Sequence, residues 1–234
     1  MKILSIYSPN YSKKLRLKSQ IKFVIFHYTG MQSEIESINR LKNPKYKVSC
    51  HYLINRKGEI IQMVKDKNIA WHAGKSRWKK FINLNNKSIG IELVNRGHQF
   101  GYQKFSIKQI KSLIFLCKRL KKKYAIKAEN FLGHSDIAPL RKSDPGEKFP
   151  WKQLSSQKIG KWYQEKKDFK LDKKKIKNSF FKNLQKLGYR YFNINKKNFK
   201  DKKVIKSFQR HYLPSNVTGI IDQETFKISH FLAN

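Results

Sequence analysis

Residues 21–30 have the sequence Ile-Lys-Phe-Val-Ile-Phe-His-Tyr-Thr-Gly, and this stretch decides the fold. The apolar run from Ile21 to Phe26 is typical of a buried strand. His27 stands at the carboxyl end of that strand, which is where open α/β sheets place their functional sites. The stretch therefore predicts a sheet with a histidine at its functional edge.

More strands and helices are expected after this one. Residues 51–55 and 59–64 predict a hairpin, because Gly58 between them tolerates the positive φ of a tight turn. Residues 88–94 predict a strand with its isoleucines and Leu93 on one face, and with Glu92 among small or apolar residues on the other. Ser33 and Ser106 are expected to cap helices over residues 33–43 and 106–123. The fold class is thus α/β, with a mixed central sheet flanked by helices that ends near Trp151.

The remainder of the chain predicts a smaller helical unit. Residues 152–175 are rich in Lys and polar, which is typical of a connector. Apolar residues then recur at helical spacing up to Gly188, again around Phe208, and once more after Asp222, which is placed to cap the last helix. We expect a first domain over residues 1–155, a connector over 156–175, and a three-helix module over 176–234.

Composition limits the class of protein. With 234 residues, 39% of them hydrophobic, the chain can build a core. It has no uninterrupted apolar run of the roughly 18 residues that a transmembrane helix requires, and residues 1–20 lack the apolar centre of a signal peptide. Cys50 and Cys117 are expected to be buried thiols.

The formal net charge of +38 would attract nucleic acid, anionic lipid or an acidic polymer. Lys is spread through every segment, however, and no helix-turn-helix, zinc finger or single-strand-binding motif accompanies it. Compositional drift toward AT-rich codons explains such a mixture of Lys, Ile and Asn better than dedicated binding. We therefore expect no nucleic-acid partner, and a basic nucleic-acid binder stays as a third hypothesis.

His134 and Asp144 lie in a segment bracketed by Gly133 and by Pro145-Gly146. Together with His27 they would supply two imidazoles and a carboxylate, leaving a fourth tetrahedral position for water, which is the pattern of catalytic zinc. The alternative is two satisfied core or surface histidines and a turn-capping aspartate, since no close His-x-x-x-His spacing supports a metal. The residues alone leave both interpretations open.

Six ordered blocks within residues 21–151 resemble the zinc-dependent N-acetylmuramoyl-L-alanine amidases of the AmpD/AmiD type. They are Phe26-His-Tyr-Thr-Gly30, Ser49-Cys-His-Tyr-Leu-Ile54, Ala70-Trp-His-Ala-Gly74, Ser88-Ile-Gly-Ile-Glu-Leu93, Gly133-His-Ser-Asp-Ile-Ala-Pro139 and Lys142-Ser-Asp-Pro-Gly146. The resemblance implies that His27, His134 and Asp144 bind one Zn²⁺. It also implies that Glu92 is the catalytic carboxylate and that Lys142 assists at the reacting carbonyl.

Other polar residues near these blocks have weaker assignments. Trp71 and His72 resemble the family's cleft wall and are candidates for binding substrate, although Trp71 is equally suited to packing. His51 is expected to orient the hairpin. The alternative is that it supports a metal ligand from behind, without binding the metal itself. Asp136 is expected to form a turn, or else to orient the loop that carries His134.

The remaining histidines, His98, His211 and His230, are expected on the surface or packed within the module.

The C-terminal module resembles a three-helical peptidoglycan-binding domain. The resemblance rests on Leu184-Gln-Lys-Leu-Gly-Tyr189, Ser207-Phe-Gln-Arg-His211 and Thr218-Gly-Ile-Ile-Asp-Gln-Glu-Thr225. The loop before Gly219 is Asn216-Val217-Thr218, where many relatives carry Asp-Gly. The alternative is a helical appendage that stabilises the first domain.

The resemblance implies a zinc hydrolase that cleaves the amide between N-acetylmuramic acid and L-alanine in peptidoglycan or (anhydro)muropeptides, during cell-wall turnover or recycling. Its rival is a non-catalytic peptidoglycan recognition protein. The lack of a signal peptide favours the cytoplasm, whereas a wall-binding module would favour the periplasm or envelope. The oligomeric state stays open.

Overall fold

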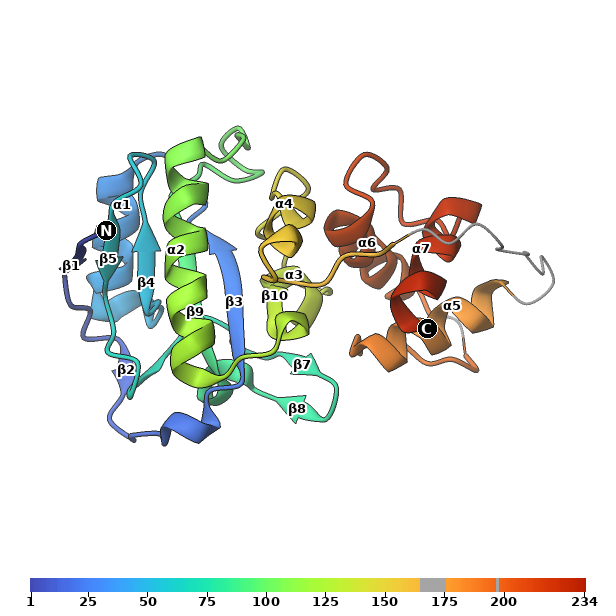
Figure 1. The fold of residues 1–234 in the computed structure, drawn as a ribbon, viewed down its shortest axis with the longest axis horizontal. Coiled ribbons are helices and arrows are strands. Elements are labelled where there is room, and N and C mark those ends of the chain that lie inside the picture. Colours follow the sequence, from blue (N-terminus) through green and yellow to red (C-terminus); the bar gives the residue numbers. More distant parts are fainter. Residues whose placement is uncertain (165–175, 197) are drawn as a thin grey trace.

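The computed structural model describes residues 1–164, 176–196 and 198–234 (Figure 1). Its centre is a six-stranded mixed sheet, which confirms the predicted α/β class. In sheet order the strands are β1 (Ile3–Ser5), β5 (Ile60–Gln62), β4 (Tyr52–Ile54), β9 (Ser88–Leu93), β3 (Phe23–Tyr28) and β10 (Phe131–Gly133). Neighbouring strands are parallel except β5 and β4, which form the predicted hairpin around Gly58.

Short strands and helices complete the described residues. Strand β2 (Tyr11–Ser12) pairs with β6 (Ile69–Ala70), and β7 (Arg77–Trp78) pairs with β8 (Phe81–Ile82). The α-helices of the described residues are α1 (Glu34–Lys42), α2 (Ile107–Tyr124), α3 (His134–Ile137), α4 (Trp151–Ser156), α5 (Ile176–Leu187), α6 (Asp201–Tyr212) and α7 (Gln223–Ala233). Single 3₁₀ turns span Lys18–Gln20, Pro44–Tyr46, Leu84–Lys87 and Ala128–Asn130. None of the described helices is long and apolar enough to cross a bilayer.

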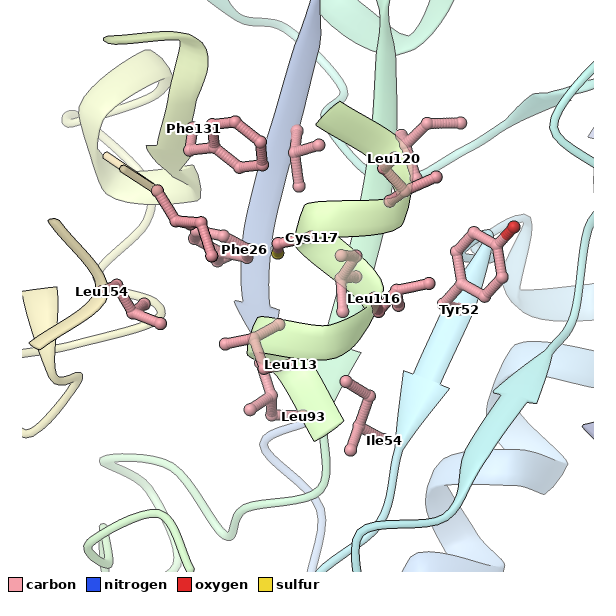
Figure 2. Close-up of a cluster of buried hydrophobic side chains, with 14 of the residues drawn as sticks. Phe26, Tyr52, Ile54, Leu93, Leu113, Leu116, Cys117, Leu120, Phe131 and Leu154 are labelled. Carbon is pink, nitrogen blue, oxygen red and sulfur yellow. The ribbon is translucent and has the colours of Figure 1, made fainter. Parts of the chain in front are cut away.

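Helix α2 covers one face of the sheet (Figures 1 and 2). It begins where the sequence predicts, because the Ser106 hydroxyl accepts a hydrogen bond from the Gln109 amide and the Gln109 side chain accepts one from the Ser106 amide. Its apolar side packs on Phe26 and Leu93, and Cys117 is buried at this contact. Each such buried side chain contributes roughly 1.5–3 kcal/mol to folding. The predicted division of strand β9 into two faces is confirmed.

The opposite face of the sheet is covered at its two ends by different elements. Near β4 and β5 it meets α1, where Leu41 and Leu53 belong to one buried cluster. Near β3 and β10 it meets the C-terminal helices, because Ile25 and Leu132 belong to the same cluster as buried apolar residues of α5, α6 and α7. The three helices therefore pack on the sheet-bearing part of the chain through a continuous apolar contact. His27 belongs to this second face, and neither apolar cluster includes it.

Two local elements differ from the sequence prediction. The polar segment predicted from residue 152 begins within a helix: Trp151–Ser156 forms α4, because one helical turn buries both Trp151 and Leu154. His134 was expected on a strand-to-loop transition, but it begins helix α3, whose first turn is closed by the Asp136 carboxylate accepting from the Gly133 amide. Residues 165–175 of the predicted connector lie outside the described residues.

Candidate functional site

The parallel strands β3 and β9 bring His27 and Glu92 together. The two residues are direct neighbours in the strand register, and strands in a sheet lie 4.7–4.9 Å apart. Both side chains are on the face opposite α2, because Phe26 before His27, and Ile91 and Leu93 on either side of Glu92, face the α2 core. This edge is the carboxyl end of both strands, as predicted for a functional site.

Strand β10 adds His134 to the same edge. It pairs with β3 so that Gly133 is opposite Phe26, which places the next residue, His134, beside His27. The Ser135 amide donates a 2.8 Å hydrogen bond to the Asp144 carbonyl. This bond joins the segment that carries Asp144 to the start of α3, so residues far apart in sequence meet at one point.

His27, His134 and Asp144 form a compact triangle of ligand atoms. The Nδ1 atoms of the two histidines lie 3.0 Å apart, and each lies 3.0 Å from Oδ2 of Asp144. Ligand atoms at about 2.0–2.1 Å from a tetrahedral zinc ion are about 3.3 Å from one another, so the triangle fits such an ion with small adjustments. Among the described residues this is the one His/Cys/Asp/Glu group whose atoms converge closely enough to hold a metal.

The second ring nitrogen, Nε2, of both His27 and His134 lies within hydrogen-bond distance of another protein group. His27 Nε2 lies 3.0 Å from His72 Nδ1, and His72 Nε2 lies 3.2 Å from the Ser88 hydroxyl, which donates to the Leu84 carbonyl. His134 Nε2 lies 3.2 Å from the Ala73 carbonyl oxygen, an acceptor, and 3.3 Å from the Arg141 guanidinium, a donor. When both Nε2 atoms carry hydrogen, each donates a hydrogen bond away from the triangle, to His72 Nδ1 in one case and to the Ala73 carbonyl oxygen in the other. Both Nδ1 atoms then present lone pairs to the site.

Gly90 makes room for His72. A Cβ atom at Gly90 would lie 2.4 Å from Cγ of His72, so the ring rests directly on the backbone of β9. His72 is 8% exposed and also lines the cavity in front of the triangle. The structure thus adds a contact with His27 that the sequence did not indicate, and the predicted contact of His72 with substrate stays a prediction.

Burial sets the ionisation of the triangle. It lowers the pKa of His27 to about 4, with the neighbouring His134 lowering it further and Asp144 opposing the change. For Asp144, burial opposes ionisation, but the neighbouring His134 and His27 outweigh it and lower the pKa of this carboxyl. At neutral pH the site therefore offers a neutral His27 imidazole and a charged carboxylate, the forms that bind metal.

The surroundings of Glu92 raise the pKa of its carboxyl, whereas those of Asp144 lower it. The Glu92 carboxyl pKa is raised to about 8, mainly by burial and also by the charge of Asp144, while Lys142 opposes the increase. Its Oε2 atom is fully buried without a hydrogen-bond partner, although the residue is partly exposed at the cavity. An unpaired buried carboxyl atom beside a ligand triangle is costly for folding alone and points to a chemical task.

A cavity of about 380 Å³ opens in front of the triangle. The side chains predicted to act there all line it, namely Trp71, His72, Glu92 and Lys142, together with the three members of the triangle. Lys142 is exposed, and its charge lowers the pKa of both His27 and Glu92, so its ammonium group acts on the same space.

His51 is the predicted site residue that stands apart. It is fully buried, its Nδ1 accepts from the Gly90 amide, and its Nε2 lies 2.7 Å from the Arg16 guanidinium. Its ring contacts that of His72, edge to face at 5.6 Å. These contacts orient the strands around the site, and any role of His51 toward a metal stays a prediction.

Sequence reasoning missed two features next to the site. The Arg141 guanidinium donates to the carbonyls of Ala73 and Lys75, which holds the loop carrying His72 against the α3 segment. Asp136 makes the expected turn contact, but it also binds Tyr189, just after α5, and His211 on α6. An acidic residue two positions after the predicted ligand His134 was the one available sequence signal.

The fold and the site together define an α/β protein with a buried His-His-Asp group at the carboxyl edge of its sheet. The model of the N-acetylmuramoyl-L-alanine amidase family Amidase_2 matches residues 17–147, and the chain belongs to this family. The chain is 37% identical to Escherichia coli N-acetylmuramoyl-L-alanine amidase AmiD, over 91% of this chain and 82% of that protein.

Two solved structures are similar over almost the whole chain. E. coli AmiD in complex with anhydro-N-acetylmuramic acid-L-Ala-D-γ-Glu-L-Lys has a TM-score of 0.78 and 35% identity, covering 91% of this chain and 88% of that one. Pseudomonas aeruginosa AmpDh3 in complex with anhydromuramic pentapeptide has a TM-score of 0.80 and 30% identity, covering 97% and 96%. The similarity includes the C-terminal helices, since both alignments exceed the extent of the sheet-bearing part.

Proposed function

We propose that this protein is a zinc-dependent N-acetylmuramoyl-L-alanine amidase, which hydrolyses the amide bond between N-acetylmuramic acid and L-alanine in peptidoglycan or its (anhydro)muropeptide fragments. The observation that carries the proposal is the triangle of His27, His134 and Asp144, with the unpaired carboxyl of Glu92 beside it. The solved complexes of AmiD and AmpDh3 with muramyl peptides support this choice of substrate.

The three residues of the triangle would hold one Zn²⁺, which lowers the pKa of a bound water and polarises the amide carbonyl. Glu92 would take the proton of the attacking water and pass it to the departing amine. Its raised pKa, close to a neutral working pH, suits both halves of that task. Lys142 would offset the negative charge that develops on the carbonyl oxygen, and Trp71 and His72 would contact the muramyl peptide from the cavity wall.

The alternative is a non-catalytic peptidoglycan recognition protein. Such a protein has no need of a complete ligand set, nor of a buried carboxyl without a partner. Both are found in this chain, which favours catalysis.

For the C-terminal part we propose a peptidoglycan-binding-like domain over residues 176–234, following a zinc amidase domain over 1–155 and a connector over 156–175. The helices would recruit or position the glycan strand. Support comes from the sequence resemblance of the three helices.

The deciding experiment combines metal analysis with a product assay. Purified protein should contain one zinc ion per chain and should release the stem peptide from a muramyl peptide, as seen by mass spectrometry. Glu92→Ala should keep the zinc but lose cleavage, whereas Glu224→Gln, an exposed position on α7, should behave as wild type. Normal cleavage by Glu92→Ala would refute the mechanism, and running intact sacculi beside soluble anhydro-muropeptides would identify the preferred substrate.

A further inference from the structure

Asp136 links the segment that carries His134 to the C-terminal helices. It is 1% exposed, and its carboxylate accepts three hydrogen bonds. Oδ2 accepts from the Gly133 amide and from His211 Nδ1, both at 2.8 Å, and Oδ1 accepts from the Tyr189 hydroxyl at 2.6 Å. Two of its three partners therefore come from the C-terminal part of the chain. We call Asp136, Tyr189 and His211 the interdomain cluster.

Further contacts fix the interdomain cluster on both sides. The Ser207 hydroxyl on α6 donates a 2.8 Å hydrogen bond to the Ser135 carbonyl on α3. The His211 ring is stacked on Trp151 at 3.7 Å between centroids, with an interplanar angle of 15°, and on Tyr212 at 4.0 Å. The His211 ring is thus held in one orientation, with its Nδ1 aimed at Asp136.

Helix α3 has little means of holding itself in place. It spans four residues, so it contains at most one turn of helical hydrogen bonds, and its position depends on contacts from outside. Asp136 is two residues from His134, and Ser135 between them is bonded to Asp144 on one side and to Ser207 on the other. A displacement of Asp136 would therefore move His134 relative to Asp144.

We infer that the C-terminal helices are a positioning element for the metal site, acting through the interdomain cluster on α3. Tyr189 and His211 are positioning residues: they contact neither the triangle nor the cavity in front of it, and they act by holding the turn that presents His134. This inference rests on the proposed function for the identity of the cation. It assigns the C-terminal helices a task within the enzyme, whether or not they also bind glycan.

The test uses the full chain and measures zinc affinity. The metal-free protein competes with a chromophoric chelator for Zn²⁺. Tyr189→Phe removes one hydroxyl from Asp136, and His211→Phe keeps a stacked ring but removes the Nδ1 donor. Disturbing groups behind a ligand weakens metal binding roughly 10–100-fold, so we expect a loss of about tenfold in each variant. The matched control is Tyr124→Phe. Tyr124 is the last residue of α2 and donates its hydroxyl hydrogen to Asp66, outside the interdomain cluster, so this variant should bind zinc as wild type does.

A second measurement does not depend on zinc. Hydrogen exchange of the Ser135 amide, which joins α3 to Asp144, should be faster in metal-free Tyr189→Phe than in wild type, and unchanged in Tyr124→Phe. Wild-type affinity together with wild-type exchange in both folded cluster variants would overturn the inference. If the wild-type protein bound no zinc, the proposed function would fail, while the exchange result would still decide whether the C-terminal helices hold α3.

Discussion

Two buried imidazole–carboxylate clusters lie on either side of helix α3. The triangle contains His27, His134 and Asp144, and the interdomain cluster contains His211 and Asp136 with Tyr189. In the triangle, three atoms that can each present a lone pair face one another at 3.0 Å. In the interdomain cluster, every acceptor bond of the carboxylate is matched by an N–H or O–H donor.

This difference separates a candidate metal site from a structural cluster. The same residue types form both clusters, and both are almost completely buried. Three lone-pair atoms that converge favour a cation between them, whereas a carboxylate that accepts from a donor at each of its contacts holds its neighbours in place. Histidine and aspartate side by side therefore say little about metal binding until the hydrogen atoms between them are assigned.

The largest contrast should come from removing one carboxylate from each cluster. Asp144→Ala deletes a ligand atom, so zinc content after dialysis and muropeptide cleavage should both fall by more than about 100-fold, beyond the range for groups behind a ligand. Asp136→Asn keeps the shape but leaves one donor without its acceptor, so it should retain zinc with an affinity about tenfold lower. Equal losses of zinc in the two variants would break the comparison.

A smaller effect is expected when Glu92 is replaced by Gln. The quantity affected is the stability of the metal-free protein, measured by thermal unfolding at several pH values. Burial raises the pKa of Glu92 from 4.5 to about 8. Between these values the folded protein holds a proton that the unfolded chain has released, so the stability that Glu92 contributes falls as pH rises through this window. Glu92→Gln removes this cost. It should unfold near the wild-type temperature at pH 5 and several degrees higher at pH 8, a gain of about 1 kcal/mol or more.

The control for this pH series is Glu224→Gln, whose difference from wild type should not change with pH because the side chain is exposed. A constant difference between Glu92→Gln and wild type from pH 5 to pH 8 would contradict the burial argument.

A third effect concerns the support behind His27. In Gly90→Ala the new methyl group must displace the His72 ring, at a cost of about 1–3 kcal/mol in unfolding free energy. Since His72 bonds to His27 Nε2, zinc affinity should also fall by about tenfold. In a His72→Ala background the same substitution should cost far less, because the ring that it strikes is gone. Equal costs in the two backgrounds would mean that His72 is not the reason for glycine at position 90.

Much of the sheet and its site could be predicted because the signals are local. The apolar run before His27, the alternation around Glu92 and the cap at Ser106 each depend on nearby residues, and the structure has these elements at the expected positions. Helix α4 was missed because its one buried turn follows a Pro and is surrounded by polar residues, which hides its apolar pair.

The interdomain cluster could not be predicted in the same way. Asp136 and His211 are 75 residues apart, and each has an ordinary local explanation, as a turn former and as a residue packed within a helical module. Nothing in the spacing of either residue indicates the other, because their contact depends on how α6 packs against α3.

The sequence by itself determined the elements, their faces and the candidates for the triangle, since hydrophobic periodicity and turn chemistry act over a few residues. Only the tertiary structure decided which histidines converge with a carboxylate in the triangle and which one bonds to the carboxylate of the interdomain cluster. Strand register set Glu92 beside His27, Gly90 admitted His72 behind it, and the packing of α6 gave Asp136 its partners. Those outcomes depend on distances between segments far apart in the chain, which local patterns do not specify.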